Sequence, residues 1–205
     1  MHRIDRIREE IAQEAARLMF EEGVKEYRDA KRKAARRFGR HKAVSLGSHL
    51  PSNAEVHAEL VQLIECYEGE VLPERLLHLR LLALKYLELF EPFRPLLVGS
   101  VLKGAVRAAS DIDLHLFADD PEEVETFLNQ QAIPYTQETV TVQHGNRFID
   151  YPHIYLEEGE TVVECTIYPP EERRHPPKSS ITGKTMERAG AKRLAELIDK
   201  DRSED

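Results

Sequence analysis

The fold is decided by residues 95–117, which read PLLVGSVLKGAVRAASDIDLHLF. The opening apolar run predicts a strand that ends at Gly99 and Ser100, and a short helical stretch follows. A second apolar strand then carries Asp111 and Asp113, with one apolar residue between them. This order of elements brings a small polar turn and a pair of carboxylates into one short stretch of chain.

The two carboxylates have the arrangement of a metal-binding pair. Because successive side chains alternate across a strand, Asp111 and Asp113 are expected on one face, and Ile112 and Leu114 on the other. Two carboxylates held side by side repel each other unless a cation lies between them. Oxygen ligands on a rigid strand suit Mg²⁺, which keeps several waters and is usually completed by substrate phosphates. His115 continues the same face by one step.

The turn that precedes the pair is suited to phosphate. Gly99 lacks a Cβ, so a phosphate can approach the backbone there, and amides at the start of the following helix can point at its oxygens. Ser100 adds a hydroxyl donor. Lys103 and Arg107 lie just beyond the turn and could contact the same phosphates. Both are equally compatible with a solvent-exposed position that contacts nothing.

Together these residues resemble the nucleotidyltransferase superfamily of the DNA polymerase β type. The family pattern is an apolar strand, Gly-Ser, often a basic residue and a glycine a few positions on, then Ser-Asp-x-Asp inside a second apolar strand. The corresponding residues of this chain are Gly99, Ser100, Lys103, Gly104, Ser110, Asp111 and Asp113. The resemblance is close over the quoted stretch and loose over residues 95–170, so it indicates the superfamily and says little about the substrate.

The resemblance also implies a third acidic residue on a neighbouring strand. Glu164 is the first choice, because alternation places it on the face opposite Cys165, where it can point into a cleft. Asp150 is the competitor. It shares its face with Phe148, and a charge on an apolar face is costly unless it is paired. Glutamate in place of the more usual aspartate is a departure from the family pattern.

The activity that the resemblance implies is nucleotidyl transfer. An acceptor hydroxyl would attack the α-phosphorus of a nucleoside triphosphate, expected to be ATP, and pyrophosphate would leave. Two Mg²⁺ ions would stabilise the entering and leaving oxygens. Asp111 and Asp113 would hold both ions, and Glu164 would complete the one that activates the acceptor. The nucleotide would be held by the turn and the residues near it: Gly99, Ser100, Lys103 and Ser110.

The acceptor is left open by the sequence, since a protein, a small molecule and a nucleic acid all offer hydroxyl groups. A rival interpretation from another class is a catalytically degenerate nucleotidyltransferase fold that binds a nucleotide or a partner protein without turnover. Intact Asp111 and Asp113 favour the enzyme, whereas the departure at Glu164 favours the degenerate fold. No sequence feature indicates the oligomeric state.

Other phosphate-binding and metal-binding motifs are absent from the sequence. Residues 183–185 match the Gly-Lys-Thr that ends a Walker motif, but Lys178 occupies the position of its first glycine. The dinucleotide fingerprint Gly-x-Gly-x-x-Gly does not occur in the sequence. Cys66 and Cys165, expected to be buried free thiols, form no Cys-x-x-Cys pair, and no His-Glu-x-x-His occurs, so zinc is not expected.

Composition and charge set wider bounds. A chain of 205 residues can hold a catalytic domain with a helical appendage. It has no apolar run of membrane-spanning length and no signal-peptide stretch, so a cytoplasmic protein without a membrane partner is expected. The net charge of −8 is uneven, because residues 25–42 hold nine Lys or Arg against Glu26 and Asp29. This basic stretch is a candidate for binding nucleic acid, although such runs are most often a solvated helix face.

Upstream of residue 95 the sequence predicts helices. Apolar residues recur at intervals of three and four, and the expected helices cover residues 4–37, 53–67 and 73–90. Gly23 interrupts the first helix and marks either a kink or a break between two helices. Ser52 or the residue after it is the candidate N-cap of the second helix.

Downstream, the pattern changes to strands after a polar helix over residues 121–131. Segments with alternating or β-branched residues predict an antiparallel meander: 135–143, 147–156 and 161–168. A last helix is expected over 186–199. The predicted fold class is α+β: a helical region over 1–92, a polymerase β-like nucleotidyltransferase domain over 93–199 with a mixed, mostly antiparallel sheet flanked by helices, and a frayed tail over 200–205.

Overall fold

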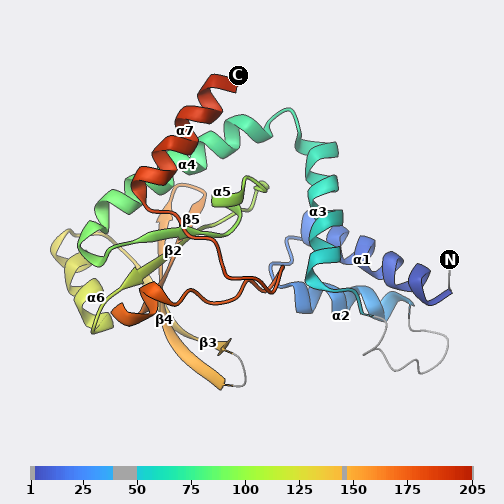
Figure 1. Cartoon of the computed structure of the whole chain (residues 1–205), viewed down its shortest axis with the longest axis horizontal. Helices are drawn as coiled ribbons and strands as arrows, with labels where there is room; N and C mark the ends of the chain where they lie inside the picture. Colours follow the sequence, from blue (N-terminus) through green and yellow to red (C-terminus); the bar gives the residue numbers. More distant parts are fainter. Residues whose placement is uncertain (1–2, 39–49, 145–146, 205) are drawn as a thin grey trace. The chain divides into compact units, whose positions relative to one another are not determined.

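The computed structural model of the chain describes residues 3–38, 50–144 and 147–204. The chain divides into two compact units (Figure 1). Unit 1 comprises Met1–Leu72 and Ser179–Lys184, and unit 2 comprises Pro73–Lys178 and Thr185–Asp205. The first division falls earlier than the predicted boundary between residues 92 and 93. The helix that follows it belongs with the sheet, because its side chains contact other elements of unit 2.

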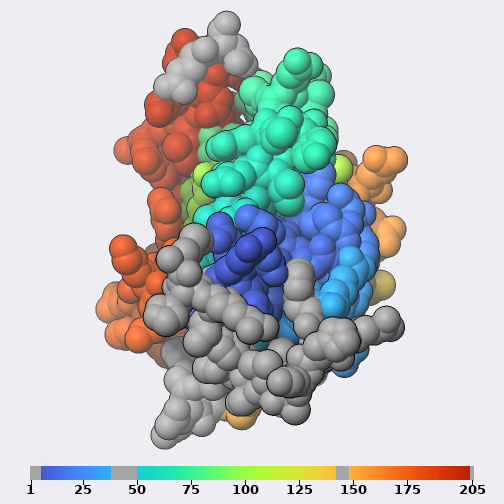
Figure 2. Space-filling view, turned by 90° about the vertical axis from the view of Figure 1, so that its right-hand side faces the viewer, coloured from blue at the N-terminus to red at the C-terminus, as the bar shows by residue number. Residues whose placement is uncertain are grey.

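Unit 1 is helical and consists mainly of α1 (Arg3–Glu21), α2 (Tyr27–Phe38) and α3 (Asn53–Glu68). Gly23, with a φ of 66°, lies between α1 and α2, so the predicted long helix is broken rather than kinked there. Buried alanines of α1 and α2 allow close approach of the helices: Ala12, Ala15, Ala16, Ala30, Ala34 and Ala35. In the space-filling view α3, in teal, lies directly against α1, in dark blue (Figure 2).

Polar contacts fix the start of α3. Ser52 accepts a hydrogen bond from the backbone N–H of Glu55, whose carboxylate accepts in return from the Ser52 backbone, so the predicted N-cap is confirmed as a capping box. The same carboxylate receives two hydrogen bonds from Arg8 of α1, at 2.6 and 2.7 Å. The guanidinium of Arg8 lowers the pKa of Glu55 to about 2. Asn53 donates to the carbonyl of Ser180, which ties Ser179–Lys184 to this unit.

The basic stretch is largely balanced by acidic residues where it is described. Arg37 pairs with Glu14 of α1, and Lys33 and Arg37 both lie within 4.0 Å of Glu22. Arg32 lies 3.4 Å from Asp29 on the same helix. The part of the stretch from residue 39 to residue 42 lies outside the described residues. Binding of nucleic acid by this segment stays a prediction.

Unit 2 is built on a mixed five-stranded sheet, counted over the described residues, with strand order β1-β2-β5-β4-β3. Its strands are β1 (Leu96–Val98), β2 (Ile112–Phe117), β3 (Thr136–His144), β4 (Arg147–Glu158) and β5 (Thr161–Tyr168). β2 and β5 are parallel, and the other three pairings are antiparallel. The α+β class with a mixed, mostly antiparallel sheet is therefore confirmed, as is the meander of the last three strands.

Helices and short 3₁₀ turns surround this sheet: α4 (Leu72–Leu89), η2 (Glu91–Phe93), α5 (Gly99–Lys103), α6 (Pro121–Gln130), η3 (Pro170–Arg174) and α7 (Ala191–Glu204). α4 and α7 lie together on one side of the sheet (Figure 1). The face beneath them is apolar: Leu114, Cys165 and Ile154, aligned across β2, β5 and β4, are each at most 1% exposed. Phe90, directly after α4, packs against Phe127 of α6.

Three expectations about unit 2 and the cysteines need correction. The helix predicted over 186–199 begins only at Ala191, because the preceding segment is extended and Ala189 forms a β-bridge with Leu97. α7 continues to Glu204, into the segment expected to be a frayed tail. Cys165 is buried as predicted, whereas Cys66 is exposed. In the part of the chain that the structure describes, no helix combines the length and apolarity needed to cross a membrane.

Candidate functional site

The second face of the sheet, opposite the apolar one, carries three rows of side chains that cross β2, β5 and β4. The carboxylate row consists of Asp113, Glu164 and Tyr155. The histidine row, two residues further along β2, consists of His115, Thr166 and His153. The aromatic row consists of Phe117, Tyr168 and Tyr151, which are packed as one buried cluster. The face thus changes from acidic to polar to aromatic along the strands.

The carboxylate row places the second and third predicted acids side by side. Asp113 of β2 and Glu164 of β5 are direct partners in the parallel register, and neighbouring strands lie about 4.8 Å apart. Asp111 lies one residue before β2 rather than inside it, and is half-buried. Burial is the main cause that raises the pKa of Tyr155, followed by Glu138 and Glu164, and the negative charge of Asp111 adds to the same effect. Asp111 therefore lies close enough to the carboxylate row to act on it electrostatically.

The competing third acid, Asp150, lies elsewhere. It falls on the other parity of β4, and therefore on the opposite face of the sheet from Tyr155. There it is exposed and accepts a 2.6 Å hydrogen bond from Thr141 of β3. Of the two candidates, only Glu164 shares a face and a register position with Asp113.

The predicted phosphate turn adjoins the carboxylate row directly. Val98, the last residue of β1, pairs with Asp113, and Gly99 follows with a φ of 74°. A Cβ placed on Gly99 would overlap Oδ2 of Asp113 and lie 3.0 Å from its Cγ. Two independent reasons therefore require glycine at this position: the left-handed backbone conformation and the close approach of the Asp113 carboxylate.

α5 is held in place by a buried arginine of α4. Arg80 is 5% exposed and donates to the carbonyls of Val101 and Leu102, each at 3.2 Å. Its other nitrogen pairs with Asp201 of α7. These contacts satisfy carbonyl groups at the end of α5, which otherwise have no partner within the helix. They therefore hold α5, and with it the Gly99 turn at its start, in place.

The remaining predicted nucleotide contacts are distributed around this turn. Ser100 is half-buried, and its carbonyl accepts from the backbone N–H of Gly104, which closes α5. Lys103 is exposed at the end of α5. The Ser110 hydroxyl accepts from the backbone N–H of Arg107 at 2.9 Å and so stabilises the turn that leads into β2.

Glu164 has a partner that the sequence did not indicate. His153 of β4 lies with its Nδ1 2.7 Å from Oε1 of Glu164 and is itself only 6% exposed. Metal-binding carboxylates are commonly held by hydrogen bonds of this kind. The donor set of Asp111, Asp113 and Glu164 suits Mg²⁺, but among the described residues no three His, Cys, Asp or Glu side chains converge as a metal site.

Charge and burial set the protonation of His115 and Tyr168. Burial first, and then the charges of Arg188 and His153, together lower the pKa of His115 to about 3. His115 is therefore neutral at physiological pH. In the aromatic row, burial raises the pKa of Tyr168 to about 12. Neither ring carries a charge next to the acids at neutral pH.

His153 and Arg188 are the site residues that sequence reasoning missed. Alternation along β4 could have placed His153 on the face of Tyr155, but its pairing with Glu164 depends on the register between two strands. Arg188 falls where a helix was predicted, and only the bridge between Ala189 and Leu97 brings it to the sheet.

Comparison of the chain with protein families, with characterised proteins and with solved structures finds no match in any of the three.

Proposed function

We propose that the chain is a Mg²⁺-dependent nucleotidyltransferase with a polymerase β-like catalytic unit, which transfers a nucleoside monophosphate from a triphosphate, expected to be ATP, to an acceptor hydroxyl. One observation carries the proposal: the Gly99 turn, Asp113 and Glu164 are adjacent on one face of the sheet. A small turn that admits phosphate beside two carboxylates on neighbouring strands is the combination that triphosphate chemistry requires.

Each residue has a distinct task in this proposal. Gly99 lets the Asp113 carboxylate lie against the turn, and Ser100 offers a hydroxyl donor at the start of α5. Asp111, Asp113 and Glu164 would hold Mg²⁺, which supplies charge neutralisation on the phosphates and lowers the pKa of the acceptor hydroxyl. His153 orients Glu164 through the hydrogen bond between Nδ1 and Oε1. Most of the acceleration would come from positioning and charge, as in phosphoryl transfer generally.

A second candidate function is a degenerate nucleotidyltransferase fold that binds a nucleotide or a partner without turnover. The observation in its favour is that the three acids do not converge in the described residues. The two functions differ in one measurable respect. A binding module retains nucleotide affinity and releases no pyrophosphate with any acceptor.

The test is pyrophosphate release from each nucleoside triphosphate, with and without Mg²⁺, across protein, small-molecule and nucleic-acid acceptors, combined with transfer of label from the α-phosphate. Asp113→Asn and Glu164→Gln should each lower the rate by about 10²-fold or more, because each removes a negative charge that positions the metal. Asp150→Asn is the matched control, since it makes the same chemical change on the opposite face. Its rate should stay within about twofold of the wild type, the range expected for a surface change that touches no reacting group.

Two results would overturn the proposal. One is binding of triphosphate without release of pyrophosphate under any of these conditions, which would support the binding module. The other is release that depends equally on Asp113 and Asp150, which would place the chemistry away from the carboxylate row.

A further inference from the structure

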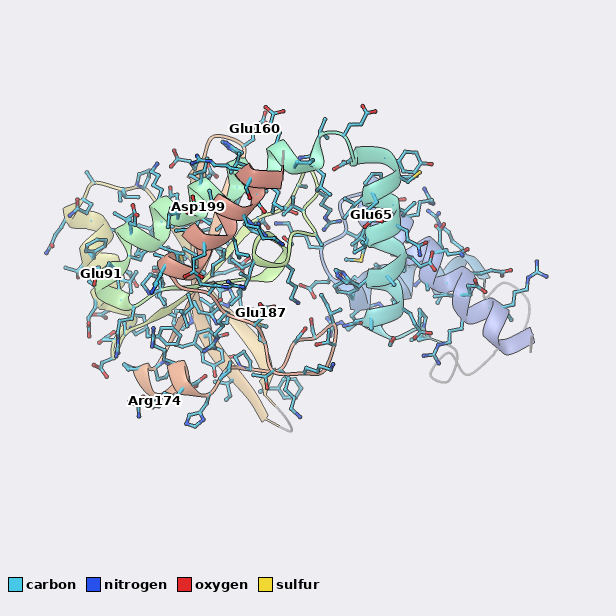
Figure 3. The ribbon with its side chains drawn as sticks, turned by 45° about the horizontal axis from the view of Figure 1, so that its top comes forward. Glu65, Glu91, Glu160, Arg174, Glu187 and Asp199 are labelled. Atoms are coloured by element: carbon cyan, nitrogen blue, oxygen red, sulfur yellow. The ribbon has the colours of Figure 1, made fainter. Side chains whose placement is uncertain are left out.

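A β-bridge outside the named strands places Arg188 on the face of the sheet that carries the carboxylate row. Leu97 of β1 and Ala189 exchange two backbone hydrogen bonds, of 2.7 and 3.0 Å, so the segment before α7 runs alongside β1. Figure 3 labels Glu187 on this segment and Asp199 on α7. Because Ala189 pairs with a residue of the apolar face and is 3% exposed, its neighbour Arg188 projects to the other face, over the aromatic row.

One end of the Arg188 guanidinium is anchored. Its Nη1 donates to the carbonyls of Glu172 and Arg173, at 3.2 and 3.5 Å. Its central carbon lies 5.6 Å from the ring centre of Phe117 and 5.8 Å from that of Tyr168. The side chain is therefore held by η3 and the aromatic row, and its orientation does not depend on the remaining two nitrogens.

Those two nitrogens are buried with nothing to bind. Nε and Nη2 of Arg188 have no hydrogen-bond partner among the residues that the structure describes. They form one edge of the guanidinium, the edge that donates two parallel hydrogen bonds to a carboxylate or phosphate. Glu172, whose charge acts on Arg188, accepts from the Tyr151 hydroxyl at 2.9 and 3.0 Å. Arg188 is half-buried as a residue, but burying these two donors without a partner is costly unless an anion completes the edge.

The neighbouring histidine row adds two further unused atoms. Nδ1 of His115 and Nε2 of His153 are also buried without a partner in the described residues, and the two rings are 5% and 6% exposed. Buried polar atoms of native proteins are nearly always satisfied by protein, water or ligand. Two such atoms in the histidine row and two on Arg188, all on one face of the sheet, indicate a polar binding site rather than a packing defect.

We infer that the Nε–Nη2 edge of Arg188 binds an oxyanion, a phosphate or a carboxylate, carried by the acceptor substrate. The assignment to the acceptor rests on the proposed function. Rows two residues apart along a strand are about 7 Å apart, and the aromatic row lies two such steps from the carboxylate row, so an oxyanion at Arg188 would lie about 14 Å from Asp113 and Glu164. The acceptor is then an anionic molecule whose phosphate or carboxylate lies about that far from the attacking hydroxyl, with its polar middle over His115 and His153.

The inference can be tested without turnover. The full chain is titrated calorimetrically with inorganic phosphate and, separately, with acetate, without Mg²⁺ and at constant ionic strength. The wild type should bind at least one of them, and Arg188→Gln should weaken that binding at least about tenfold because it removes the charge and the bidentate edge. Arg188→Lys should fall between the two, since an ammonium cannot make the paired bonds.

Arg173→Gln is the matched control. Arg173 is an exposed cation 6.0 Å from the same Phe117 ring, and its loss should change affinity by no more than about twofold. If only phosphate binds, the oxyanion that Arg188 recognises on the acceptor is a phosphate. If only acetate binds, it is a carboxylate. If Arg188→Gln does not fold, as judged by circular dichroism, the comparison between wild type and Arg188→Lys decides.

The inference is overturned if neither anion binds at about 10 mM, or if Arg188→Gln and the wild type bind equally. Its failure is separable from that of the proposed function, because Asp113→Asn should retain anion binding while losing pyrophosphate release. Anion binding by a chain that releases no pyrophosphate would keep the Arg188 site and remove only its assignment to an acceptor.

Discussion

Replacement of Gly99 by alanine should damage the site more than the fold. An alanine at a φ of 74° costs about 1–2 kcal/mol, because L-residues are strained in the left-handed region. The new Cβ would also overlap Oδ2 of Asp113 and lie 3.0 Å from its Cγ. Carbon atoms in normal contact are about 3.5–4.0 Å apart, so the carboxyl group must retreat by about 0.5–1 Å. A displacement of this size at a reacting centre lowers turnover by about 10²-fold.

Gly104 is the control for this experiment. It has a φ of 84°, and a Cβ there would meet Leu76 at 3.6 Å and Arg80 at 3.8 Å, both ordinary contacts. Gly104→Ala therefore carries the backbone cost without displacing Asp113. Urea unfolding should give both variants a loss of about 1–2 kcal/mol, larger for Gly99→Ala, whereas pyrophosphate release should fall only for Gly99→Ala. Equal rates in the two variants would refute the argument that Gly99 exists to admit the Asp113 carboxylate.

Two further predictions concern stability. Arg80→Met removes the hydrogen bonds to the carbonyls of Val101 and Leu102 and leaves Asp201 unpaired, so urea unfolding should report a loss of about 3 kcal/mol in the free energy of unfolding. The control is Lys85→Met, which breaks an exposed pair with Glu158 and should cost less than about 1 kcal/mol. Similar losses in the two variants would contradict the role given to Arg80. His115 has a folded pKa of about 3, below its unfolded value of 6.5, so the unfolded chain binds the proton first and stability falls as pH drops below 6.5. Between pH 7 and pH 5 the wild type should lose about 2 kcal/mol more than His115→Gln, and an NMR titration placing the His115 pKa near 6.5 would contradict this.

Local patterns in the sequence were sufficient for the elements and for part of the site. The spacing of apolar residues predicted the helices of unit 1, and period-two segments predicted the meander of β3, β4 and β5. Gly99, Asp113 and Glu164 were selected because their chemistry is local: a residue without a Cβ, and carboxylates on strands with a definite parity. Alternation even favoured Glu164 over Asp150, and the faces found in the sheet agree with that parity.

The boundary between the two units and the structure of residues 186–190 could not be predicted from local sequence patterns. α4 resembles the earlier helices in its apolar pattern, and only the contact of Arg80 with α5 and that of Phe90, directly after α4, with α6 assign it to the sheet unit. Residues 186–190 have no strand pattern of their own, and a single bridge to Leu97 holds them extended. Long-range pairing of this kind depends on the partner surface, which a local pattern does not contain.

The sequence by itself determined the α+β class and selected the Gly99 turn and the candidate acids, because each follows from residue type and from a period of two or 3.6. Tertiary structure alone decided that Glu164 stands opposite Asp113, that His153 holds it, and that Arg188 presents an unused edge above the aromatic row. These three facts depend on strand order and register, which place residues far apart in the chain within a few ångströms. The physical reason is that hydrogen-bonded registers between distant segments are fixed only when the whole sheet forms.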